Sequence, residues 1–263
     1  MSTAMTTIDT GRPSVPLSRL IKVEVRKTFD TRAGRWFSAS ILIICAIALT
    51  LFAIFADEGF YDLQDMVSIA GGILGFFLPI VLIMMVTAEW GQRTGLVTFT
   101  LEPRRSRVVT SKLVAGVLIS LVVLVLAFGI AGLATGFADV VRDGAVSWSV
   151  DSVVILNFLL GNVIGVLVGF AIAMLLMNTA AAIVVYFLYS LVFPIVLGIL
   201  SATIGWFADV APWIDFNTAQ APLFTGDFRL NGEEWARFAV TGTIWLVIPL
   251  ALGIVRLLRA EVK

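Results

Sequence analysis

The chain has no histidine and a single cysteine among its 263 residues. Zinc sites, and nucleophiles activated by a neighbouring base, are built largely from these two residue types. Neither kind of site is therefore expected, and a disulfide within the chain is excluded. The one cysteine, Cys45, falls inside an apolar run, where we expect it to act as a small packing residue.

Charged residues are also scarce. They make up 14% of the chain, against 59% apolar residues and a mean hydropathy of +1.01. Soluble globular domains carry about 25% charged residues. The apolar excess is gathered in long blocks, as in a protein that crosses a membrane several times. Because the formal net charge is zero, nothing favours nucleic acid as a partner.

Two further absences narrow the function. The sequence has no GxxxxGK[ST] loop, so the chain does not bind and hydrolyse ATP by that device. Its long apolar runs contain no Asp, Glu or Lys, which coupled transporters generally place along their ion pathway. Paired carboxylates and a GxSxG motif, which an intramembrane hydrolase could use, are missing as well. We therefore expect a protein that is not an enzyme and binds no metal or cofactor itself.

The N-terminal part has two sections. Residues 1–16 contain Pro13 and Pro16 and no apolar core, which excludes a cleavable signal peptide and predicts a disordered cytoplasmic tail. Residues 17–35 place apolar side chains at helical spacing among several Arg and Lys, which predicts a basic amphipathic helix. Such a helix before a span usually lies in the headgroup plane at the membrane interface. A soluble linker helix is the alternative.

Residues 36–263 are predicted to form one transmembrane domain with six spans. The first has 21 uncharged residues and would be about 31 Å long as a helix, which matches the hydrocarbon core. The fifth is longer than one bilayer thickness and contains Pro194, so we expect it to be kinked or tilted. The predicted fold class is thus an all-α membrane protein, with spans at 36–56, 66–88, 113–138, 152–177, 180–207 and 237–257.

The segment 208–236, before the last span, is too polar to cross a membrane and yet rich in aromatic residues. Aromatic side chains at this density are typical of the membrane–water interface. We expect short interfacial or re-entrant helices here, with an ordinary outer loop as the alternative. The aromatic residues are Trp213, Phe216, Phe224, Phe228 and Trp235.

The distribution of Lys and Arg predicts the orientation. The N-terminal part through Arg35 holds seven, the loop 89–112 holds five and the C-terminal end holds three. The opposite loops hold only Arg142, Arg229 and Arg237. Cytoplasmic loops carry the excess of positive charge, so both termini are expected in the cytoplasm. The sorting also favours an even number of spans.

Small and neutral polar residues mark the fourth span. Gly161, Gly165 and Gly169 follow one another at four-residue spacing, which predicts a face pressed against another helix. Asn157 and Asn162 lie in the same span. Neutral polar side chains in spans most often form hydrogen bonds between helices, and a place along a substrate pathway is the alternative.

The loop 89–112, between the second and third spans, has the most distinctive pattern. Glu89 near the end of the second span is followed by Thr94–Gly95, then by a proline with basic neighbours, and finally by Lys112 at the start of the third span. Together with the basic N-terminal helix, the six spans, a tight turn at 177–180 and the aromatic outer segment, this order resembles the permease subunits of ABC-2 type exporters. Glu24 and Lys27, ahead of Trp36, also look like the opening of that family. The proline and its basic neighbours are Pro103, Arg104, Arg105 and Arg107.

The resemblance implies a permease in the plasma membrane of a bacterium. It would pair with a second copy or a homologue, and two separate ABC ATPase subunits, which bind ATP and Mg²⁺, would dock on its cytoplasmic side. The segment 89–103 would be a coupling helix seated on the ATPase, flanked by the interface helix with Glu24 and Lys27, and the turn 177–180 would be a second, minor contact. The residues assigned to coupling are Glu89, Arg93, Gly95, Pro103, Arg104 and Arg107.

The neutral, apolar spans favour an amphipathic substrate such as a drug, a peptide or a lipid-like molecule over an ion. A membrane protein that is not driven by ATP is the alternative: a secondary transporter, a channel, or an assembly or scaffold subunit.

Overall fold

The computed structural model describes residues 15–30, 32–56, 61–92, 94–142, 144, 146–223 and 230–259. Helices account for nearly all of this part of the chain, and no strand occurs in it. Six helices are long and apolar enough to cross a membrane. The predicted all-α membrane fold with six transmembrane helices is therefore confirmed.

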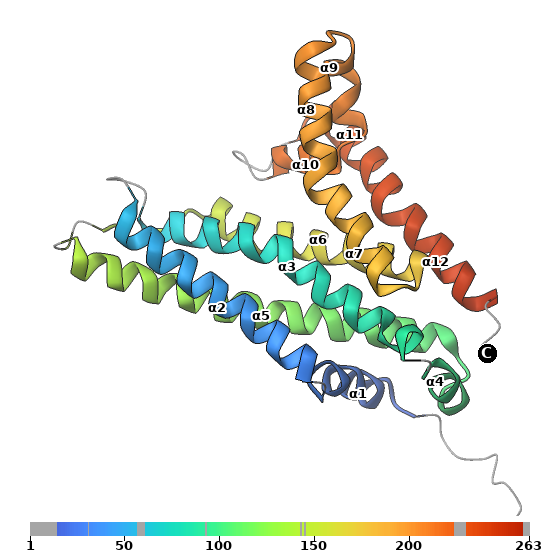
Figure 1. Cartoon of the computed structure of the whole chain (residues 1–263). Helices are drawn as coiled ribbons and strands as arrows, with labels where there is room; N and C mark the ends of the chain where they lie inside the picture. The colour runs from blue at the N-terminus through green and yellow to red at the C-terminus, as the bar shows by residue number, and fades with distance from the viewer. Residues whose placement is uncertain are drawn as a thin grey trace, which may run out of the picture.

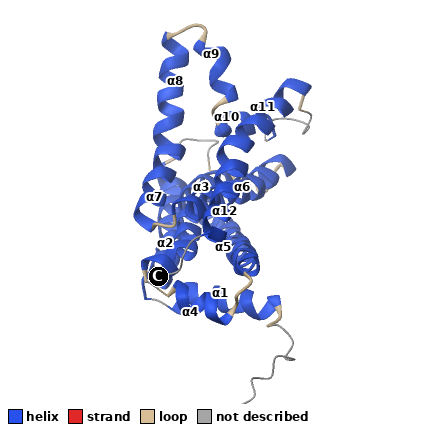
Figure 2. Ribbon diagram, turned by 90° about the vertical axis from the view of Figure 1, so that its right-hand side faces the viewer, coloured by secondary structure: helices blue, strands red, loops and turns tan. Residues whose placement is uncertain are grey.

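The N-terminal amphipathic helix α1 (Leu17–Asp30) precedes α2 (Arg32–Phe55), and residue 31 lies between them. The amphipathic helix thus ends at Asp30, five residues earlier than the sequence suggested, and Gly34 lies in the first turn of α2. In Figures 1 and 2, α1 crosses the end of the bundle near α4. The predicted tail falls outside the described residues except for Val15 and Pro16.

The main bundle consists of α2, α3 (Leu63–Gly91), α5 (Arg105–Val141) and α6 (Ser152–Leu176), which lie side by side in Figure 1. The contact between α3 and α6 is the most extensive between any two elements. It is close because α6 presents glycine to α3: a Cβ placed at Gly169 would lie 2.8 Å from the Cβ of Pro79. Side chains such as Leu78, Leu82 and Phe170 fill this core.

The segment 89–112, expected as a polar loop, is mostly helical. The short helix α4 (Gly95–Leu101) lies inside it, and α5 already begins at Arg105, eight residues before the expected start of the third span. At 1.5 Å per residue the 37 residues of α5 extend about 55 Å, more than a bilayer needs. The first two turns of α5 therefore belong with α4 to a polar end of the molecule.

The fifth span is broken in the middle. It consists of α7 (Thr179–Phe187), a π-helical turn (Leu188–Val192) and α8 (Phe193–Thr203), so it ends four residues before the expected Phe207. The sixth span repeats this construction with α11 (Gly232–Gly242), a π-helical turn (Thr243–Val247) and α12 (Ile248–Arg259). Each π turn comes just before a proline, Pro194 or Pro249. Proline cannot donate the hydrogen bond that an α-helix requires, and the widened turn accommodates the loss.

The two broken spans contact each other at their π turns, where the rings of Tyr189 and Trp245 lie 4.6 Å apart. They meet the main bundle near α4 and diverge from it toward the other end, as Figures 1 and 2 show. Short helices connect them at the far end, as predicted for the aromatic segment: α9 (Phe207–Val210), α10 (Phe216–Gln220) and two 3-10 turns. Phe224 and Phe228 lie outside the described residues.

Three arginines bind the carboxyl ends of neighbouring helices. Arg142 donates to the carbonyls of Ile54 and Ala56 at the end of α2, at 3.1 and 2.6 Å. Arg256 donates to Leu175 at the end of α6 at 2.6 Å, and Arg105 donates to Leu257 in α12. The last carbonyls of a helix have no partner within it and carry partial negative charge. Cations at these points therefore fix the helix ends to one another.

Candidate functional site

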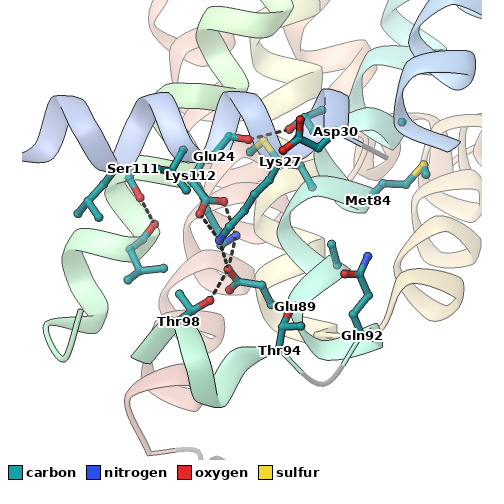
Figure 3. A pocket seen from close by; sticks show the side chains of 18 of the residues that line it. Glu24, Lys27, Asp30, Met84, Glu89, Gln92, Thr94, Thr98, Ser111 and Lys112 are labelled. Carbon is teal, nitrogen blue, oxygen red and sulfur yellow. Dashed lines mark hydrogen bonds and ion pairs between the residues drawn. The ribbon is translucent and has the colours of Figure 1, made fainter. Parts of the chain in front are cut away.

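Four charged side chains from three helices meet at the polar end of the bundle. Glu24 and Lys27 come from α1, Glu89 from the last turn of α3 and Lys112 from the second turn of α5 (Figure 3). The ammonium of Lys112 lies 2.6 Å from Glu24 Oε2 and 3.3 Å from Glu89 Oε1. The ammonium of Lys27 lies 2.9 Å from each of the same two carboxylates. These four residues are called the charge cluster below.

The charge cluster is largely shielded from solvent. Glu24 and Lys112 are each 4% exposed and Glu89 is 6% exposed, whereas Lys27 is partly exposed. Buried charges are tolerated only when they are paired and hydrogen-bonded. Two carboxylates facing two ammonium groups give a local charge of zero, which meets that condition. The cluster therefore holds α1, α3 and α5 in one arrangement.

The short helix α4 joins this cluster through one hydroxyl. Thr98 donates a hydrogen bond of 2.9 Å to Glu89 Oε1, the oxygen that also accepts from Lys27. A second contact fixes the end of α4, because the buried Glu102 pairs with Arg107 at 2.8 Å. A displacement of α4 would therefore displace the carboxylates of Glu89 and Glu102, and through them α1, α3 and α5.

Lys27 is the member of the cluster that faces solvent. Burial alone would lower the pKa of its ammonium, but the hydrogen bonds to Glu24 and Glu89, with the charges of these carboxylates, raise the pKa above its ordinary value of 10.5. Lys27 thus stays positively charged at every physiological pH. The cluster keeps its balance of two positive and two negative charges as long as both glutamates are ionised.

A cavity of about 830 Å³ lies beside the cluster, between α1, α3, α4 and α5 (Figure 3). Glu24, Lys27, Glu89, Thr98 and Lys112 line its polar part. Its apolar part includes Val81, Met84 and Met85 from α3 and Leu20 and Val23 from α1. The cavity leaves unfilled space between α1, α4 and the helices of the bundle.

Two exposed apolar side chains of α4 line this cavity, on the same face of the helix as Thr98. Val97 and Leu101, one helical turn apart, are 57% and 76% exposed. The neighbouring Thr100 is exposed as well, and Phe99 turns inward against Trp90 and Arg105. Two exposed aliphatic side chains on a seven-residue helix, which is too short to cross a membrane, offer a contact to a partner protein or to the membrane surface.

The structure brings some of the residues predicted for coupling together and leaves others apart. Glu89 lies in the cluster with both residues predicted on the interface helix, Glu24 and Lys27, and Arg107 is tied to Glu102. Gly95 begins α4, while Pro103 and Arg104 are exposed between α4 and α5. Arg93, also assigned to coupling, lies outside the described residues.

Sequence reasoning missed two members of this site. Lys112 was noted only as the start of a span, and Thr98 was not noted at all. Lys112 did carry a signal, because a lysine that lies next to a long apolar run either extends to the membrane interface or pairs with a carboxylate. For Thr98, no pattern distinguishes it from other surface threonines.

The tight turn between α6 and α7 lies close to this site. Met177 adopts a left-handed conformation with a φ of 50°, and the side chain of Asn178 caps α7 by accepting from the amide of Ala181 at 3.0 Å. Thr179 forms a hydrogen bond of 2.7 Å with the buried Thr87 of α3 and also lines the cavity. The predicted minor contact thus connects directly to the helix that ends at Glu89.

The glycines and asparagines of α6 lie farther along the bundle, against α3. Gly165 and Gly169 face Gly75 and Pro79, while Gly161 lines a second, smaller cavity between the two helices. Asn162 is buried at this cavity and Asn157 lies at its exposed rim. Among the described residues, no group of three or more His, Cys, Asp or Glu gathers where it could hold a metal ion.

Comparison with protein-family models gives no match for this chain, and comparison with curated proteins gives none either. The fold and the geometry of the site show a multi-pass helical membrane protein. Its particular role has to be argued from the charge cluster and its surroundings.

Proposed function

We propose that the chain is the permease subunit of an ATP-driven exporter, and that α4 with the charge cluster receives motion from separate ATPase subunits. The observation that carries the proposal is the connection of one exposed short helix, through buried ion pairs, to three longer helices. A short element fixed in this way transmits a rigid-body displacement to the elements it holds. The likeness of segment 89–112 to the coupling segment of ABC-2 type permeases supports the same role.

Each part of the site has a place in this proposal. Val97 and Leu101 form the contact with the ATPase, and Glu89 conveys the displacement of α4 to α3. Glu24 and Lys112 carry it to α1 and α5, and the turn at Met177 to Thr179 brings α6 and α7 within reach of the same partner. The cavity beside the cluster gives α1 and α4 the room that the movement requires. On this proposal, both chain termini and α4 lie in the cytoplasm of a bacterial cell, and a second permease copy or homologue completes the pathway.

The test is co-purification of ATPase activity. The tagged chain, extracted in mild detergent from its own cells, should carry an ATPase with it. Leu101→Ser should lose that activity, because it removes an exposed apolar side chain of α4. Thr100→Ala, the matched control at the exposed residue directly before Leu101, should keep the ATPase activity. If the unaltered chain purifies with no ATPase, the proposal fails and a protein not driven by ATP is the better description.

A further inference from the structure

The cavity between α3 and α6 is lined by a buried polar side chain, one atom of which forms no hydrogen bond with the described residues. The cavity measures about 260 Å³, and α3 contributes Gly71, Gly72 and Gly75 to it. Asn162 of α6 lies in its wall and is 3% exposed. The Oδ1 atom of Asn162 is buried and has no hydrogen-bond partner among the residues that the structure describes.

The orientation of the Asn162 amide is fixed by its neighbours. Its Nδ2 donates to the carbonyl of Phe158 at 2.7 Å and to the carbonyl of Gly71 at 3.3 Å. Only the NH₂ end of the amide can donate to these carbonyls, so the oxygen end is the one left over. A buried acceptor without a donor is destabilising, and native proteins rarely keep one unless something else supplies the donor.

The glycines explain why a cavity lies beside the Asn162 amide. A Cβ placed at Gly75 would lie 3.7 Å from Asn162 Oδ1, in ordinary contact with it, whereas a Cβ at Gly72 would meet nothing within 4 Å. The absence of side chains at these positions therefore leaves the cavity next to Asn162. Ser68, Gly72 and Asn157 are exposed at the rim, so the cavity is reached from the surface of the molecule.

We propose that this cavity is a binding site for a neutral group that donates a hydrogen bond, a hydroxyl or an amide N–H, carried by an amphipathic molecule. The donor binds Asn162 Oδ1, and the apolar remainder of the molecule packs against Val67, Val154 and Phe158. A neutral donor fits because no charged residue lines the cavity, and an ion would be left uncompensated in this surrounding. The space is well above the roughly 10–15 Å³ that a single water molecule needs.

The inference deepens the proposed function, because the bound molecule would be a substrate of the exporter. Only this identification as a substrate rests on the proposed function. The cavity belongs to the first halves of α3 and α6, whereas the charge cluster lies at the other end of α3. A molecule bound here would therefore sit along the helix that ends at Glu89. Movement of α4 would reach it through α3.

Photolabelling of the purified full-length chain in detergent tests the inference. The probe is an eight-carbon alcohol that carries a diazirine, and its methyl ether serves as the comparison because it has the same chain and no donor. We expect the alcohol to label segments 65–75 and 152–165 saturably in the unaltered protein and in Gly72→Ala. Gly75→Ala, which covers the Asn162 oxygen, should weaken this labelling about tenfold, as expected for one lost hydrogen bond. The ether should give only unsaturable labelling.

If Gly75→Ala does not fold, Asn162→Leu, which replaces the amide by an apolar group of similar size, should show the same loss. The inference is overturned if alcohol and ether label the cavity alike, or if the alcohol still labels these variants at the original level. It is equally overturned if the alcohol labels no residue of the cavity, as when a helix of a second copy or water alone fills it. The experiment involves no ATPase, so its outcome is independent of the co-purification test.

Discussion

Lys112 and Glu24 lie 88 positions apart in the sequence, yet their charged atoms are 2.6 Å apart and both side chains are buried. Lys112 also faces Glu89, while Glu24 also faces Lys27. The pair thus stands at the centre of a balanced cluster. Its burial means that each charge depends on the others for compensation.

Lys112→Met should destabilise the protein strongly. The substitution leaves two buried carboxylates with one ammonium between them, and removing one partner of a buried ion pair costs about 3–5 kcal/mol. Thermal unfolding in detergent, followed by tryptophan fluorescence, should show a clearly lower Tm. Lys22→Met, at an exposed position of the same helix as Glu24, should change the stability by less than about 0.5 kcal/mol.

The double variant Glu24→Gln with Lys112→Met should recover part of the loss, because it removes one charge of each sign. Additive losses would argue against direct coupling of the two residues.

The raised pKa of Lys27 predicts how the stability depends on pH. A lysine whose folded-state pKa lies above its unfolded value stabilises the fold fully below the unfolded value, and this contribution is lost as the pH rises through the folded-state pKa. The difference in Tm between the unaltered protein and Lys27→Met should therefore be constant from pH 7 to about pH 9. It should shrink only at pH values above the ordinary lysine pKa of 10.5. A difference that already shrinks near neutral pH would contradict the raised pKa of Lys27.

Gly169→Ala should disturb the contact between α3 and α6. The new methyl group would lie 2.8 Å from the Cβ of Pro79 and 3.1 Å from its carbonyl oxygen, so that backbone has to move. Overpacking of this kind costs about 1–3 kcal/mol. Gly198→Ala is the matched control, because nothing lies within 4 Å of that position and alanine favours the helix. Equal Tm values for Gly169→Ala and Gly198→Ala would contradict the packing described here.

The sequence predicts the spans well because a long apolar run has few ways to fold in a membrane. It predicts the ends of helices less well. Segment 89–112 reads as a polar loop, yet α4 and the first two turns of α5 lie within it. Its charged side chains have partners elsewhere in the chain. Arg105 donates to a carbonyl near the end of α12, and Lys112 pairs with Glu24 on α1. Such partners are not visible in a local pattern.

The long-range arrangement shows the same limit. Glu24 falls among the polar positions of an amphipathic helix, where an exposed side chain is the natural expectation. The structure buries it, because α1 packs along α5 with this residue facing Lys112. The kink at Pro194 could be predicted from proline alone, and Pro249 offers the same argument, whereas the contact of Tyr189 with Trp245 depends on two spans meeting in space.

The orientation of the chain in the membrane is the prediction that connects the structure with the proposed function, and the single cysteine makes it testable. Cys45 is fully buried, so a membrane-impermeant maleimide should not react with the unaltered folded protein. Ser149→Cys lies at an exposed position between α5 and α6, and we expect the reagent to label it on intact cells. Thr100→Cys on α4 should react only after the membrane is opened, because an ATPase partner requires α4 in the cytoplasm. Labelling of Thr100→Cys on intact cells would place α4 outside and exclude the coupling role. Labelling of both sites on intact cells would show that α5 does not cross the membrane.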